Sequence, residues 1–134
     1  MRCIVSETAD LPERFEIGDG HATHRPEGHA SFQEALELAS QAVVYCRENG
    51  IRRLLIDTTK LTGFGTLGTA ERFTVGERLA SDARAAVKVA LLARPEVLDP
   101  NRFGTTVARN RGLFSSSFSS ESEAWKWLLD PNAE

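Results

Sequence analysis

The spacing of apolar residues first indicates an amphipathic helix over residues 31–48. Apolar side chains recur there at intervals of three and four, which puts them on one helical face; they are Phe32, Ala35, Leu36, Ala39, Val43 and Cys46. Ser31 followed by Glu34 matches a capping box at the start of this helix. Gly50 suits the left-handed position beyond its end. We therefore predict a helix with one face on the core.

A continuous aliphatic run follows this helix directly. The run Leu54-Leu55-Ile56 is flanked by turn-forming residues, which is typical of a strand covered on both faces. It predicts a strand over residues 51–57 that ends at Asp57, followed by a loop over residues 58–69 rich in glycine and threonine. In an open parallel α/β sheet, ligands and partners meet the chain at the carboxyl ends of strands. The loop is therefore predicted to lie at the working edge.

The rest of the chain alternates between strands and helices. The further predictions are a short strand over 2–6, a hairpin of 14–17 with 21–26, helices over 69–83, 99–112 and 120–130, and strands over 87–93 and 113–118. A helix between two strands is the crossover that parallel strands require. This order predicts an α/β layer sandwich.

Length and composition fit one soluble domain. The 134 residues, treated as a single domain over 1–134, are enough to bury a core. A net charge of -3 gives no broad attraction to nucleic acid, and no run is long enough for a membrane span. Cys3 and Cys46 are too few for a disulfide scaffold and are both expected to stay reduced. Without a signal-peptide pattern, the expected compartment is the cytoplasm.

Three histidines within nine residues raise the question of a metal site. On a strand, His21 and His24 would point to opposite faces, because side chains alternate. No cysteine or second histidine cluster completes a ligand set around His29. We therefore predict exposed loop histidines, no metal and no catalytic residues, since no serine stands in a nucleophile-elbow pattern either.

The segment Gly63-Phe64-Gly65-Thr66-Leu67-Gly68 superficially resembles a dinucleotide fingerprint. The connection from Asp57 is too long for the tight turn of that fingerprint, and Ala93-Arg94-Pro95 supplies no acidic ribose partner. No cofactor is predicted, and the glycines are expected to let the loop turn. An alternative is that Thr66 or Thr69 caps the next helix and that free amides there bind an anion.

Two further features leave their interpretation open. Arg109, Asn110 and Arg111 stand at a helix end, where positive charge is favourable, but they would also form a docking patch for a carboxylate or phosphate. Phe64 follows the strand closely. It would serve either as an exposed partner contact or as a side chain buried under the loop.

Several stretches resemble the STAS family, especially its SpoIIAA-like branch. They are Leu55-Ile56-Asp57 with Leu61-Thr62-Gly63, the run 87–92, Arg102-Phe103-Gly104, the run 108–112, and Phe118 with Glu123-Ala124-Trp125. The resemblance implies a bacterial regulatory protein with an α/β fold, in which a mixed sheet of about four to five strands carries about four helices.

Better-known members of that family are protein-interaction switches. A Ser or Thr at the start of the helix after this strand is phosphorylated by a partner kinase, which adds charge and can abolish docking. Asp57-Thr58-Thr59 is similar in chemistry but falls at the strand end, whereas Thr66 and Thr69 stand near the helix start without the acidic residue. The candidate binding or phospho-switch residues are Asp57, Thr58, Thr59, Phe64, Thr66 and Thr69.

The sequence thus favours a non-enzymatic interaction or regulatory module that docks a protein partner through the loop 58–69. The alternative is a small-ligand or lipid-binding domain of the same fold, which a sizeable apolar pocket beneath Phe64 and Phe73 would favour. An uncovered N-terminal edge strand would also allow a homodimer. The sequence leaves the oligomeric state open.

Overall fold

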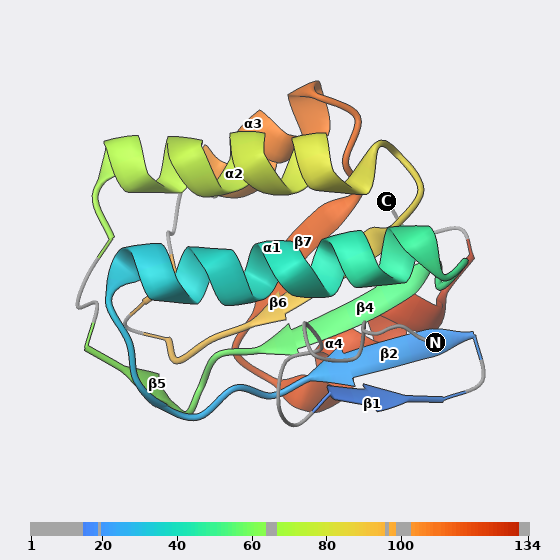
Figure 1. Ribbon diagram of the computed structural model, residues 1–134, viewed down its shortest axis with the longest axis horizontal. Coiled ribbons are helices and arrows are strands. Elements are labelled where there is room, and N and C mark those ends of the chain that lie inside the picture. Colours follow the sequence, from blue (N-terminus) through green and yellow to red (C-terminus); the bar gives the residue numbers. More distant parts are fainter. Residues whose placement is uncertain (1–14, 19, 64–66, 96, 99–102, 132–134) are drawn as a thin grey trace.

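The computed structural model describes residues 15–18, 20–63, 67–95, 97–98 and 103–131 (Figure 1). Its elements are β1 Phe15–Ile17, β2 His21–His24, β3 Gly28–His29, α1 Phe32–Glu48, β4 Arg53–Asp57, β5 Leu61–Thr62, α2 Thr69–Ala83, β6 Lys88–Leu92, α3 Phe103–Asn110, β7 Ser115–Phe118 and α4 Glu121–Leu129. The predicted α/β class is confirmed. The predicted strand over residues 2–6 and the proposed helix start at Asp99 lie outside the described residues.

The main sheet is mixed and has five strands in the order β1-β2-β4-β6-β7. β1 runs antiparallel to β2, with Phe15 opposite His24, and the other neighbours are parallel. The predicted hairpin is therefore confirmed, and α1 is the crossover between β2 and β4. In the described part of the chain β1 ends the sheet, where Ile17 is 55% exposed. The homodimer through this edge stays a prediction.

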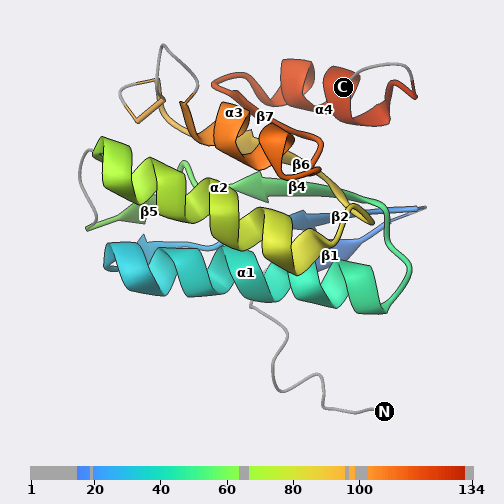
Figure 2. The same cartoon turned by 90° about the horizontal axis from the view of Figure 1, so that it is seen from above.

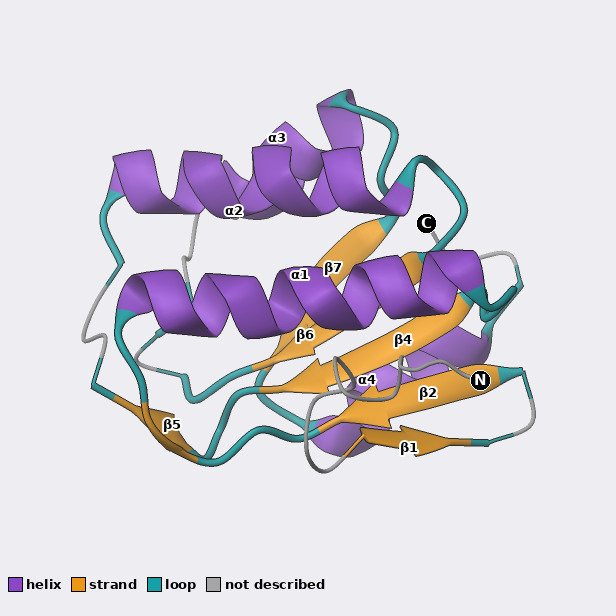
Figure 3. Ribbon diagram, viewed as in Figure 1, coloured by secondary structure: helices purple, strands orange, loops and turns teal. Residues whose placement is uncertain are grey.

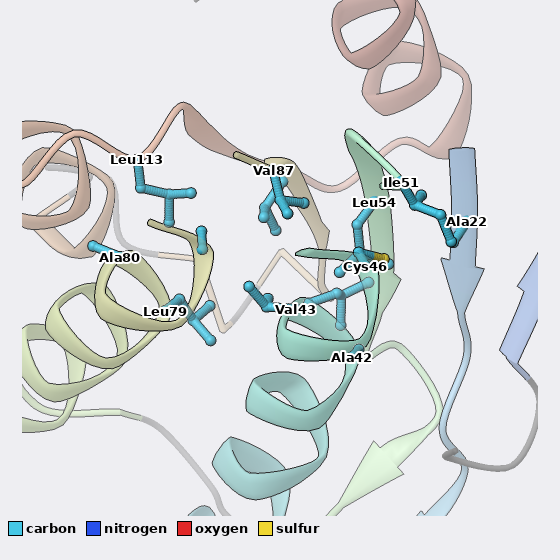
Figure 4. Close-up of a cluster of buried hydrophobic side chains, with 13 residues drawn as sticks. Ala22, Ala42, Val43, Cys46, Ile51, Leu54, Leu79, Ala80, Val87 and Leu113 are labelled. Carbon is cyan, nitrogen blue, oxygen red and sulfur yellow. The ribbon is translucent and has the colours of Figure 1, made fainter. Parts of the chain in front are cut away.

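Helices cover the two faces of the sheet unequally. α1, α2 and α3 lie on one face and α4 on the other (Figure 2). Leu54 enters the larger core under α1 and α2 (Figure 4), and Ile56 belongs to the same core. Because side chains alternate along β4, Leu55 enters a smaller core under α4 instead. Among the described residues, no helix combines the length and apolarity needed to cross a bilayer.

Local signals in the sequence explain where the helices begin. Glu34 donates its N–H to the Ser31 Oγ over 3.1 Å, and Ser31 donates its N–H to the Glu34 Oε1 over 2.9 Å. This is the predicted capping box, and it satisfies two backbone donors that the first turn leaves unpaired. At α4, the Ser120 Oγ likewise accepts the N–H of Glu123.

A second sheet of two very short strands was not anticipated. β3 and β5 pair in parallel, with Gly28 opposite Leu61 and His29 opposite Thr62 (Figure 3). Beside this pairing, Ala30 donates its N–H to the Thr62 carbonyl over 2.7 Å. This ribbon, β3 with β5, fixes the first half of the loop after β4 against the segment that follows β2.

Candidate functional site

The predicted working edge forms where the parallel strands end. The arrowheads of β2, β4 and β6 point to the same side of the molecule (Figure 1). Asp57, the last residue of β4, pairs with Leu92, the last residue of β6. The residue after β2, Arg25, reaches the same place. The carboxyl edge therefore collects polar groups from segments that are far apart in the sequence.

Arg25 joins two carboxylates at this edge. Its Nη1 lies 2.8 Å from the Asp57 Oδ2 and 3.0 Å from the Glu121 Oε1, and its Nη2 lies 2.7 Å from the Glu121 Oε2. We call Asp57, Arg25 and Glu121 the carboxylate clasp. Glu121 also accepts the indole N–H of Trp125 over 3.2 Å. The clasp ties the end of β4 and the first residue of α4 to the segment after β2.

Hydrogen bonds within the clasp shift the pKa values of Glu121 and Arg25. The hydrogen bond from Arg25 is the main reason that the pKa of Glu121 lies below its usual range. The pKa of Arg25 is raised, chiefly by the hydrogen bond to Glu121 and against the opposing effect of burial. The Asp57 side chain is only 9% exposed, whereas that of Glu121 is 44% exposed. Asp57 is therefore the member that depends most on its cation.

The two threonines after Asp57 use their hydroxyls internally. Thr58 donates both its N–H and its Oγ1–H to the Leu92 carbonyl, over 2.8 and 3.0 Å. Thr59 donates its N–H and its Oγ1–H to the Asp57 Oδ1, over 2.9 and 2.6 Å. Both residues are half-buried. These bonds shape the turn out of β4, and a modification of either hydroxyl would have to break them.

A different residue from the one expected caps α2. Gly68 occupies the N-cap position, and its N–H is donated to the Glu71 Oε1 over 2.9 Å. Thr69 is the first helical residue and is exposed, so the proposed cap at Thr69 is wrong. Glu71 already places a carboxylate where an anion would bind. Phe64 and Thr66 lie outside the described residues.

A cleft of about 360 Å³ opens beside the clasp. Its lining residues are Arg25, Pro26, Asp57, Thr59, Lys60, Leu92, Ser119 and Glu121. The charged groups inside it largely satisfy one another through the clasp and the bonds of Thr59. The cleft is therefore polar, with most of its donors and acceptors already engaged.

The arginine patch lies at the opposite edge of the sheet, because α3 leads into the start of β7. The Arg109 Nε donates to the Ser115 carbonyl over 3.0 Å. The Arg111 guanidinium lies 5.1 Å from the centre of the Phe73 ring and 3.6 Å from the Glu77 carboxylate. Asn110 is exposed. The two arginines thus hold neighbouring elements together. The predicted docking patch of residues 109–111 and the loop 58–69 lie at different edges of the sheet and do not form one site.

The histidines occupy three different environments. His21 makes an edge contact with Trp125 at 5.0 Å, whereas His24 packs near Phe15 on the other face, so the predicted opposite orientation is confirmed. His24 is fully buried, which corrects the expectation of an exposed loop histidine; His29 is exposed. Burial lowers the pKa of His24 to about 4. Within the described residues, no three His, Cys, Asp or Glu side chains gather as metal ligands.

The sequence alone did not identify Arg25 and Glu121 as members of one site. Arg25 directly follows a strand, and that position is the one signal that could have suggested it. Glu121 lies 96 residues further along the chain. Its place in the site depends on how α4 packs across the sheet.

In comparisons with known proteins, the chain matches no family model and no curated relative. The STAS resemblance therefore rests on the residues quoted for it.

Proposed function

We propose that this protein is a non-enzymatic interaction module of the STAS type that docks a partner protein through the loop 58–69. The observation that carries the proposal is the way in which this loop is held. Over residues 58–63 its backbone is fixed by the Asp57–Thr59 turn and by the ribbon, while the side chains of Lys60 and Thr62 face solvent. The Lys60 side chain is 69% exposed, and Thr62 is exposed beside it. A pre-ordered loop loses little conformational entropy when a partner binds.

The way in which the polar groups are used supports the non-enzymatic part of this proposal. The Asp57 carboxylate accepts three hydrogen bonds, from Thr59 and Arg25, and the Thr58 hydroxyl is donated to a backbone carbonyl. Groups engaged in this way support the turn and the clasp. Among the candidate threonines that the structure describes, Thr69 is the exposed one, in the first turn of α2, and would accommodate a regulatory phosphate most easily.

Site-specific photo-crosslinking in the native host tests the docking proposal. A benzophenone amino acid at Thr62 should capture a partner, and Lys60→Glu in the same chain should change the yield of that product, because it reverses an exposed charge two residues away. The control places the same probe at Lys126, an exposed residue of α4 outside the loop. The proposal fails if Thr62 and Lys126 give the same products, or if Lys60→Glu leaves the Thr62 product unchanged.

The second candidate is binding of a small polar molecule in the 360 Å³ cleft. That volume is within the range of about 300–1,000 Å³ common for ligand sites. A lipid has less support, because Phe73 is 37% exposed under Arg111 instead of roofing an apolar pocket. A ligand that raises the melting temperature of the wild type, but not of Thr59→Val, would favour this candidate.

A further inference from the structure

A second hollow of about 430 Å³ lies between the first turns of α1 and the ribbon. Its floor is aliphatic: Ala30 and Leu61 are 5% and 2% exposed, and Leu38 is half-buried. The hollow is shallow and largely open to solvent, and it borders the loop 58–69 directly, because Leu61 belongs to both. We call it the α1 groove.

The rim of the α1 groove is acidic. Glu27, Glu34 and Glu37 all line it, and all three are exposed. The backbone N–H of Ser31 is the main reason that the pKa of Glu34 lies below its usual range, so this carboxylate is charged at neutral pH. An aliphatic floor inside an acidic rim is a distinctive combination of shape and charge.

The cations near this rim hold its carboxylates loosely. Lys60 lies 3.9 Å from Glu27, and Arg78 lies 3.0 Å from Glu37, in each case between exposed side chains. Exposed ion pairs of this kind contribute little and exchange partners readily. These ion pairs are exposed and weak, so a positively charged partner gains contacts with the carboxylates of the rim at little cost.

From these observations we infer that the α1 groove receives a basic amphipathic segment of the partner protein. One aliphatic side chain of that segment seats on Ala30, Leu38 and Leu61, and flanking lysines or arginines face the three glutamates. The acidic rim disfavours nucleic acid and anionic membranes by charge repulsion. This inference rests on the proposed docking function and names the chemistry of the partner.

Synthetic peptides of about twelve residues test the inference with the full chain. A fluorescent lysine–leucine peptide is titrated by anisotropy, beside a glutamate–leucine peptide and a lysine–serine peptide. The first should bind saturably, more weakly at about 500 mM than at 50 mM salt. The other two should bind at least about tenfold more weakly. Amide chemical shifts of Ala30, Leu38 and Leu61 should move with the first peptide.

A pair of matched substitutions on α1 locates the effect. Gln33 lines the groove and Gln41 does not, although both are exposed on the same helix. Gln33→Lys should raise the Kd of the lysine–leucine peptide about tenfold, and Gln41→Lys should change it by less than about twofold. The inference is overturned if the two variants behave alike, if the acidic or serine peptide binds equally well, or if the shifted amides lie elsewhere.

Two further outcomes separate this inference from the docking proposal. If Gln33→Lys changes the sedimentation coefficient of the protein alone, the groove holds a second copy of the chain and the inference falls. If crosslinking at Thr62 captures a partner while no basic peptide binds, docking stands and the assigned chemistry is wrong. Peptide binding without any Thr62 product would mean that the groove accepts basic segments but that the loop 58–69 does not dock a partner.

Discussion

Arg25 and Asp57 are 32 residues apart in the chain, yet the Nη1 of one lies 2.8 Å from the Oδ2 of the other. The pair is unequal: the Arg25 side chain is 29% exposed and that of Asp57 is 9% exposed. Removing the cation would leave a buried carboxylate without its strongest donor, whereas the arginine can turn to water. Loss of the pair would therefore cost more free energy at Asp57 than at Arg25.

Replacing Arg25 by Met should lower the free energy of unfolding by about 1–3 kcal/mol, because Asp57 stays buried without its cation. Urea unfolding at neutral pH measures this. The control is Lys60→Met, which removes a pair between the exposed side chains of Lys60 and Glu27 and should cost at most about 1 kcal/mol. Equal losses in the two variants would show that the Arg25–Asp57 pair is no stronger than a surface contact.

His24 should make the protein less stable in mild acid. Its pKa falls from 6.5 to about 4 on folding, so between these values the unfolded chain binds a proton that the native protein does not. Stability is therefore lost as the pH falls through this window, by about 2 kcal/mol from pH 7 to 4.5. His24→Leu should remove that part of the pH dependence, and the exposed-site control His29→Gln should retain it. Urea titrations at both pH values give the comparison.

Gly63→Ala should release the ribbon. An added Cβ would lie 2.7 Å from the His29 ring and 2.8 Å from the Ala30 carbonyl, and the φ of +106° strains any other residue. The expected result is faster hydrogen exchange of the Ala30 N–H, which is donated to Thr62. Gly112→Ala is the control, because its φ is +91° but nothing lies near its Cβ. If Gly63→Ala leaves this exchange unchanged, the close packing at Gly63 does not hold the ribbon.

Ala85→Gly should stabilise the protein by about 0.5–1 kcal/mol, because Ala85 has a φ of +61°, where a Cβ is unfavourable. Ala86→Gly, one residue later and without a positive φ, should instead destabilise by about 0.5–1 kcal/mol. Thermal unfolding followed by circular dichroism distinguishes the two signs. A decrease for both variants would mean that the strain at Ala85 is too small to matter.

The elements with strong local signals could be predicted from the sequence. The capping box of Ser31 and Glu34 and the stripe behind it define α1, and the aliphatic run ending at Asp57 defines β4. β3 and β5 have two residues each, too few to show any periodicity. Their pairing depends on Gly63 fitting beneath His29, which is a tertiary contact.

The candidate site was predictable only in its location. The aliphatic run before Asp57 predicts the end of a strand, which puts Asp57, Thr58 and Thr59 at the carboxyl edge of the sheet. The hydrogen bonds that engage their side chains come from elsewhere in the fold: Arg25 reaches Asp57, and Leu92 accepts from Thr58. Charge and spacing along a chain do not encode such pairings, because they arise when separate elements pack together.

The unequal layers give the molecule two parts of different local stability. The core between α4 and the sheet consists of five buried residues, which come from β4, β6 and α4. At its start Glu121 holds Arg25, and at its end Lys88 donates to the carbonyls of Trp127 and Asp130. The opposite face buries a far larger set of side chains. We therefore expect α4 to open as a separate cooperative unit, with its amides exchanging before those of α1 and β4.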